Sequence, residues 1–93
     1  MTEKNTTFIR MYDIKAAENC EEALAHFLAS LGEDIRQAEG CIGYDLAEHQ
    51  DGFRVTEEWL NESSYQASKA YFPKEKLKAA EKLFAAPPVK VEP

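Results

Sequence analysis

Residues 41–59 read CIGYDLAEHQDGFRVTEEW, two runs of alternating apolar and polar residues separated by a turn. In the first run the apolar side chains at 42–46 recur at every second position, which is the period of a strand. The dipeptide Asp51-Gly52 favours a tight turn between antiparallel strands. Residues 53–59 then alternate again, so this part of the chain predicts a β-hairpin.

A strand and an amphipathic helix are predicted before this hairpin. Residues 8–14, FIRMYDI, are apolar and aromatic, as is typical of a strand. Asn19 is expected to cap a helix, because Glu22 follows three residues later and completes a variant of the capping box. Gly40 is expected to end that helix in a left-handed conformation. The helix carries one apolar stripe, formed by Leu24, Phe27, Leu28, Leu31 and Ile35.

A second helical segment and a short strand are predicted after the hairpin. Asn61 is expected to cap a helix that runs through Tyr65 to about Phe72. Pro73 has no backbone donor, so it should kink or restart that helix. The segment continues with a second apolar stripe and ends before a closing strand at 89–91; the stripe consists of Leu77, Ala80, Leu83 and Phe84.

The order of these elements predicts the fold class. Strand, helix, strand, strand, helix and strand give a ferredoxin-like βαββαβ arrangement, an α+β fold whose antiparallel sheet carries both helices on one face. Residues 1–93 are expected to form a single domain with a polar N-terminal arm at 1–7. The other face of the sheet is left bare in so small a domain, and we expect a second copy of the chain to cover it.

Composition excludes several classes of function. Seventeen acidic residues stand against eleven basic ones, for a net charge of −6, which disfavours nucleic acid as a partner. The N-terminus has no apolar signal segment and no apolar run is long enough for a membrane span, so a cytoplasmic location without membrane contact is expected. Five lysines lie between residues 69 and 82, either as a docking site for an anion or as a solvated helix face.

No cofactor or metal is expected. Cys20 and Cys41 stand alone and suit a reducing compartment as free thiols. His26 and His49 have no metal-ligand spacing with each other or with a cysteine. The sequence also contains neither a dinucleotide-binding nor a phosphate-binding glycine motif.

The strand at 53–59 contains the residues most suited to chemistry. Glu57 interrupts an otherwise apolar row and needs a partner if it is buried, for which Arg10 is the expected one. It is then either a structural salt bridge or a catalytic acid or base. Trp59 and Tyr65 can converge at the mouth of the space between sheet and helices. Their polar tips suit either the orientation of a flat aromatic ligand or simple core packing.

Several motifs together resemble one known family. Residues 39–44, EGCIGY, are followed by Glu57-Glu58-Trp59 and by a helix start at 61–65, NESSY, with Pro-Pro-Val near the end. This pattern resembles the antibiotic biosynthesis monooxygenase family from about residue 8 to residue 91. The resemblance implies a homodimer that forms a dimeric α/β barrel through its sheet faces, with one pocket in each subunit. Some members of the family are cofactor-independent monooxygenases that oxidise polycyclic phenols to quinones.

The resemblance also implies site residues and partners. Trp59 and Tyr65 would be catalytic residues, since a Trp and a Tyr at this spacing contact the substrate in those enzymes. Glu57, singled out above from its strand, is expected to act with them by holding the pocket or accepting a proton. The partners would be a second copy of the chain and a small apolar or aromatic ligand. The substrate pocket would be lined by Val55, Phe27, Phe72 and Tyr44.

Two departures from the family pattern keep an alternative open. Val55 stands where the phenol-oxidising enzymes have an Asn, and no His follows His49 to act as a haem ligand. Haem degradation is therefore not expected. The sequence is compatible with a monooxygenase for a small aromatic or quinol-like substrate. The alternatives are a non-catalytic ligand-binding or stress-response protein and an isomerase of the same fold.

Overall fold

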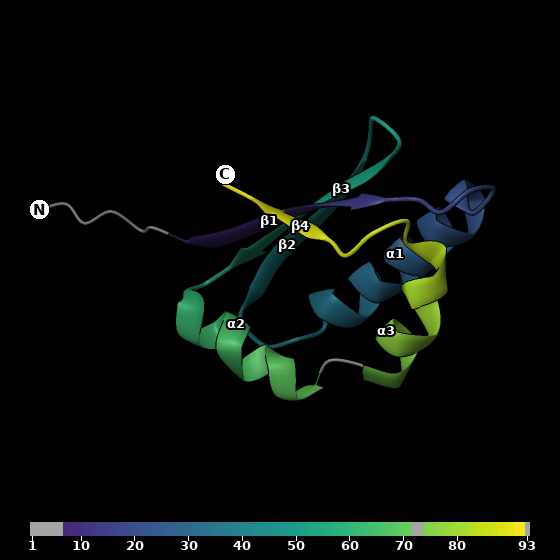
Figure 1. Cartoon of the computed structure of the whole chain (residues 1–93). Coiled ribbons are helices and arrows are strands. Elements are labelled where there is room, and N and C mark those ends of the chain that lie inside the picture. Colours follow the sequence, from purple (N-terminus) through teal and green to yellow (C-terminus); the bar gives the residue numbers. More distant parts are fainter. Residues whose placement is uncertain (1–6, 72–73, 93) are drawn as a thin grey trace, which may run out of the picture.

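A four-stranded antiparallel sheet covered on one face by helices makes up the protein (Figure 1). The structure is a computed structural model that describes residues 7–71 and 74–92. The strands lie in the order β2-β3-β1-β4, which confirms the ferredoxin-like α+β fold. The elements in chain order are β1 (Phe8–Lys15), α1 (Glu21–Arg36), β2 (Cys41–His49), β3 (Gly52–Trp59), α2 (Glu62–Ser68), η1 (Lys69–Tyr71), α3 (Lys74–Ala80), η2 (Glu81–Leu83) and β4 (Val89–Val91).

In the second helical segment α2 ends at Ser68, earlier than the predicted end near Phe72, and is followed by the short helix η1; the break predicted at Pro73 lies outside the described residues. Phe72 and Pro73 are not described, and α3 begins at Lys74 directly after them. The cap predicted at its start is confirmed, because the Asn61 side chain accepts a hydrogen bond from the backbone N–H of Ser64 at 2.8 Å. None of the described helices is long and apolar enough to cross a membrane.

The predicted ends of α1 are wrong in detail. The helix begins at Glu21, and its N-cap residue, Cys20, makes no side-chain cap hydrogen bond. Asn19 instead has a positive φ of 62°, a left-handed conformation that asparagine tolerates, and turns the chain into the helix. The helix ends at Arg36, before Gly40, which has a φ of 89° just ahead of β2. Gly40 therefore serves the turn into the hairpin and not the helix terminus.

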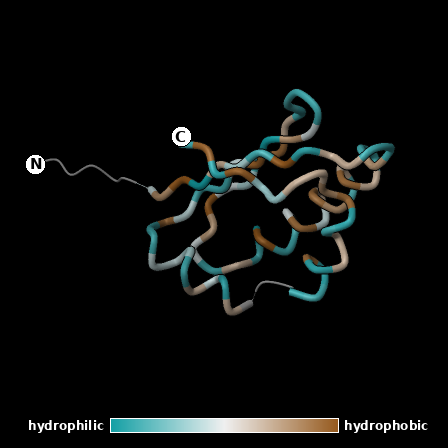
Figure 2. The backbone as a smooth tube through the Cα atoms, viewed as in Figure 1, coloured by the Kyte–Doolittle hydropathy of each residue, from teal (hydrophilic) through white to brown (hydrophobic). Residues whose placement is uncertain are grey.

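The core lies between the sheet and α1. The predicted stripe on α1 faces the sheet, with Leu24 and Leu28 fully buried, and Val55 and Trp59 of β3 are fully buried opposite. Figure 2 shows hydrophobic segments along the strands and α1, whereas the tip of the hairpin between β2 and β3 is hydrophilic. Burial of these large side chains is the main favourable contribution to folding.

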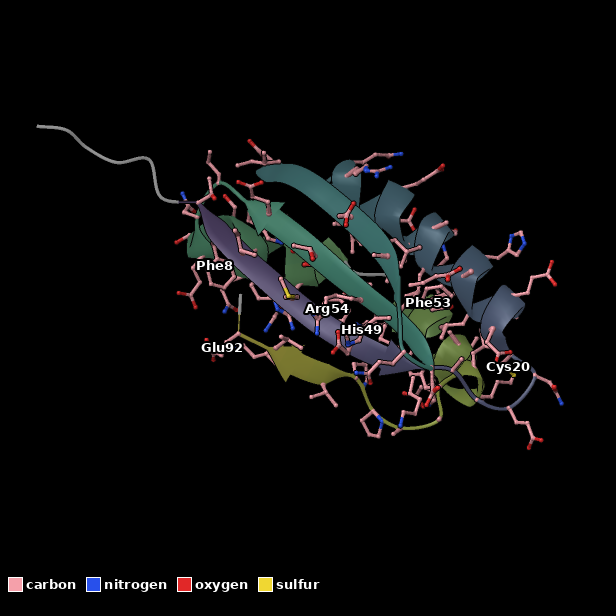
Figure 3. All side chains as sticks on the ribbon, turned by 90° about the horizontal axis from the view of Figure 1, so that it is seen from above. Phe8, Cys20, His49, Phe53, Arg54 and Glu92 are labelled. Carbon is pink, nitrogen blue, oxygen red and sulfur yellow. The ribbon has the colours of Figure 1, made fainter. Side chains whose placement is uncertain are left out.

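Arg54 and His49 lie on the outer face of the sheet (Figure 3). They form an ionic cluster there with Asp13. Arg54 donates from Nε and Nη2 to the two carboxylate oxygens of Asp13 at 2.7 and 3.0 Å. These hydrogen bonds lower the pKa of Asp13. His49 Nε2 lies 3.5 Å from the same carboxylate. Strand register places Val89 opposite Asp13, on this same face.

The predicted turn between β2 and β3 is confirmed, but Gly52 is not one of its two central residues. The two turn residues are Gln50 and Asp51, and the positive φ of 53° belongs to Gln50. Gly52 is the first residue of β3, where a Cβ would overlap the backbone carbonyl oxygen of Ile14 in β1. Glycine is required here because the two strand backbones approach each other closely.

We therefore expect Gly52→Ala to lower the free energy of unfolding by about 1–3 kcal/mol, because β1 must move to admit the methyl group. Urea denaturation of the purified protein measures this change. Gly43→Ala is the matched control, since a Cβ at Gly43 in β2 has no atom within 4 Å. Equal stabilities of the two variants would contradict the close approach of β1 to Gly52.

Candidate functional site

A cavity of about 240 Å³ lies between the inner face of the sheet and the helices. Its walls are largely apolar and come from β1, α1, α3 and the segment before β4. These apolar residues include Ile14, Phe27, Leu28, Leu31, Leu77 and Phe84. The polar side chains that line it are Arg10, Tyr12 and Lys90. An apolar chamber with a few polar groups is the usual form of a small-molecule site.

Strand register brings these polar side chains together. Arg10 and Tyr12 are two residues apart on β1, so both point to the inner face. Lys90 on β4 is the Cα partner of Tyr12, which places it on the same face in the neighbouring strand. On the other side of β1, Glu57 of β3 is the Cα partner of Arg10. The centre of the inner face is therefore polar, although the surrounding residues are apolar.

Glu57 is a carboxylate with no exposed surface, 0% accessible to solvent, and both of its oxygens are hydrogen-bonded. The Trp59 indole Nε1–H donates to Oε1 at 3.0 Å, and the Tyr12 hydroxyl donates to Oε2 at 2.7 Å. Hydrogen bonds of this kind are what make a buried carboxylate tolerable. Glu57 in turn fixes the orientation of both aromatic side chains.

Arg10 does not pair with Glu57, so the predicted ion pair between them is wrong. Tyr12 and Trp59 already occupy the carboxylate oxygens, and Arg10 Nη1 donates to the Tyr65 hydroxyl at 2.7 Å instead. The guanidinium carbon lies 5.2 Å from the centre of the Tyr12 ring and 4.7 Å from that of Tyr65. The two rings therefore hold the cation by cation–π contacts.

Two tyrosines near Glu57, Tyr12 and Tyr44, are held in their protonated form. Burial, together with the nearby Glu57 carboxylate, raises the pKa of Tyr12 well above its ordinary value. The same two causes raise the pKa of Tyr44, whose hydroxyl donates to the Leu28 backbone carbonyl at 2.9 Å. Tyr12 is thus a hydrogen-bonding group in the cavity wall and not a base.

The family of the chain follows from comparison with known proteins. The sequence model of the family described as "Antibiotic biosynthesis monooxygenase" matches residues 7–85. The chain belongs to this family. A sequence search of curated proteins gives no significant match.

Several solved structures are similar in fold to this protein. A Nitrosomonas europaea protein described as a candidate antibiotic biosynthesis monooxygenase is 13% identical, with 98% of this chain and 91% of that chain covered and a TM-score of 0.81. Rv0793 of Mycobacterium tuberculosis is 17% identical, with 95% of each chain covered and a TM-score of 0.77. A similarly described Deinococcus radiodurans protein is 24% identical, with 91% and 90% covered and a TM-score of 0.75.

The three residues expected to be catalytic in this family member lie together, one layer behind the cavity. The rings of Trp59 and Tyr65 have centroids 5.9 Å apart, and Glu57 bonds to Trp59. None of the three is among the described residues that line the cavity. They connect to it through Tyr12, which bonds to Glu57, and Arg10, which bonds to Tyr65.

The residues expected to line the pocket are distributed differently. Phe27 lines the cavity. Val55 and Tyr44 are buried in the core and are not among its lining residues. Phe72 lies outside the described residues.

Two polar residues of the site were not predicted, Tyr12 and Lys90. Both could have been found from strand period, since Tyr12 follows Arg10 by two positions and Lys90 stands between two valines of a predicted strand. No group of three His, Cys, Asp or Glu side chains within 7–70 and 74–92 could hold a metal ion.

Proposed function

We propose that this protein is a cofactor-independent monooxygenase that oxidises a small phenol or quinol bound between its sheet and helices. One observation carries the proposal, an apolar cavity of about 240 Å³ with a tyrosine hydroxyl and two cationic side chains in its wall. Ligand sites for drug-sized molecules are usually about 300–1,000 Å³. A substrate of one or two rings therefore suits this cavity best.

The reaction balances without an added reductant. The phenol loses its O–H proton, and the electron-rich ring carbon opposite the hydroxyl forms a bond to one atom of O₂. The O–O bond then breaks, so that one oxygen becomes the second quinone carbonyl. The other leaves as water with the phenolic proton and the ring hydrogen. All electrons that reduce O₂ come from the substrate.

The side chains of the cavity would favour the first step. Arg10 and Lys90 stabilise the phenolate, because a nearby cation lowers the pKa of a phenol. The apolar walls leave less water around a bound ligand than bulk solvent does and so strengthen this attraction. O₂ is itself apolar and enters such a chamber readily.

The residues behind the cavity would act as positioning groups. Glu57 fixes the Tyr12 hydroxyl, and Trp59 completes the hydrogen bonding of that carboxylate. Tyr65 holds the Arg10 guanidinium in place. Preorganised groups of this kind contribute to catalysis because they need not reorient during the reaction.

A second function, ligand binding without catalysis, is favoured by a specific observation. Both oxygens of Glu57 are hydrogen-bonded, and no carboxylate is among the described lining residues to accept a proton. In that case the protein would hold an aromatic ligand and leave it unchanged.

Oxygen uptake distinguishes the two functions. We expect purified protein to accelerate O₂ consumption by one- and two-ring phenols such as 1-naphthol, without added flavin or metal. Leu77→Trp should lower this rate about tenfold or more, because the larger ring fills the cavity and displaces the substrate. Leu60→Trp is the control, since Leu60 is 58% exposed and lies outside the cavity. Binding of the phenols with no O₂ uptake would contradict the monooxygenase and favour the binding protein.

We also propose that the protein is a homodimer joined through the outer face of the sheet. Two large apolar side chains are exposed on this face, Ile9 at 37% and Val89 at 61%. They lie on β1 and β4 around the ionic cluster of Asp13, Arg54 and His49. A second copy that packs there by two-fold symmetry would bury these side chains.

Sedimentation equilibrium tests the dimer. We expect a species of twice the 10.5 kDa chain at micromolar concentration. The double variant Ile9→Glu/Val89→Glu should dissociate it, because buried like charges oppose each other across the interface. Leu60→Glu, at a position that is 58% exposed and outside the sheet, should leave the dimer intact. A wild-type protein that sediments only at 10.5 kDa would overturn this proposal.

A further inference from the structure

We propose that the ligand of the cavity is an anionic aromatic compound, a ring that bears a carboxylate, and that Arg10 and Lys90 bind the carboxylate. This inference deepens the proposed function, on which it rests for the aromatic character of the ligand. It assigns the two cations the recognition of a carboxylate in addition to the stabilisation of a phenolate.

The charge of the cavity is opposite to that of the chain. The protein carries a net charge of −6, yet two cations and no carboxylate are among the described residues that line the cavity. Arg10 and Lys90 come from strands at neighbouring positions of the sheet, β1 and β4. A cavity for a neutral ring would bind it better without cations, because desolvation of a charged side chain weakens binding.

The two cations are close enough to act on one group. Lys90 is the Cα partner of Tyr12, and Arg10 precedes Tyr12 by two residues on the same face. Arg10 and Lys90 are therefore diagonal neighbours across two paired strands, a relation in which Cα atoms lie about 7–8 Å apart. Long side chains at this separation can both reach a single carboxylate, with the Tyr12 ring between them.

Arg10 is oriented in advance for such a ligand. Its Nη1 donates to Tyr65, and the rings of Tyr12 and Tyr65 flank the guanidinium. A guanidinium has five N–H donors, and this is the single side-chain hydrogen bond that Arg10 makes within the described part of the chain. No carboxylate in that part forms an ion pair with it. Donors therefore remain for an incoming anion.

Lys90 makes the net charge of the cavity wall positive. Glu57 lies opposite Arg10 in the neighbouring strand and offsets part of its charge, even though Tyr12 and Trp59 take its hydrogen bonds. Lys90 is exposed and has no ion-pair partner among residues 7–70 and 74–92. Replacement of Lys90 should therefore weaken binding of an anion while the fold remains intact.

Isothermal titration calorimetry with a matched pair of ligands tests the proposal. The probes are 1-hydroxy-2-naphthoate and 1-naphthol, which share the ring and hydroxyl and differ in the carboxylate. At pH 7 the naphthol is neutral. We expect the acid to bind about tenfold or more tightly, because charge-assisted bonds to a carboxylate are the strong ones. Its affinity should fall more steeply with added salt than that of the naphthol.

Charge variants assign the effect to these side chains. Lys90→Gln should weaken binding of the acid by about two- to fivefold, the range of an exposed ion pair, and weaken binding of 1-naphthol less. Lys78→Gln is the matched control, because Lys78 is an exposed lysine of α3 outside the cavity. Arg10→Lys keeps the charge but loses the planar donors, and should weaken the acid more than the naphthol.

The outcomes separate this inference from the proposed function. Equal affinity for the two ligands, no binding of either, or equal weakening of both by Lys90→Gln would overturn the anionic ligand. If 1-naphthol binds, oxygen uptake with it would still support the monooxygenase. Tight, Lys90-dependent binding of the acid without oxygen uptake would support the anionic ligand and contradict the monooxygenase.

Discussion

The arrangement of the inner face depends on one buried carboxylate. Glu57 has no exposed surface, and an ionised group in that position is very costly unless it is hydrogen-bonded. The Tyr12 hydroxyl and the Trp59 indole supply those bonds, which fixes two large aromatic side chains on adjacent strands. The same carboxylate contributes to the raised pKa of Tyr12 and of Tyr44. The rest of the site follows from where these rings lie.

Because Tyr12 and Trp59 take the hydrogen bonds of Glu57, the nearby cations do not pair with this carboxylate. Arg10 lies directly opposite Glu57 in the sheet but bonds to Tyr65, so its remaining donors are available at the cavity wall. An acidic protein thereby keeps two cations in the wall of a largely apolar cavity. This combination favours an aromatic ligand that is anionic or becomes anionic, and a phenolate that is oxidised by O₂ is one such species. The proposed oxidation would need orientation and an apolar surrounding more than a protein base.

Much of the fold could be predicted from local sequence features. The alternating runs on either side of the turn predict β2 and β3, and the Asn61 side chain caps α2 as expected. The start of α1 could not be predicted, because Asn19 adopts a left-handed turn that competes with capping. Strand period placed Glu57 and Arg10 on one face, but it does not determine which of several neighbouring donors reaches the carboxylate. Nor does it separate inner-face residues of the core, such as Val55, from those that line the cavity, because the packing of α1 and α3 decides that.

A double-mutant cycle between Glu57→Leu and Tyr12→Phe tests the central role of the carboxylate most directly, with urea denaturation as the measurement. The hydrogen bond between these residues predicts a coupling free energy of about 1.5–3 kcal/mol, the range for a bond to a charged group. The cycle between Glu57→Leu and Tyr65→Phe is the control and should show weaker coupling, because Tyr65 bonds to Arg10 and not to Glu57. Additive effects of Glu57→Leu and Tyr12→Phe would contradict the account, since the two side chains would then not meet in the folded protein.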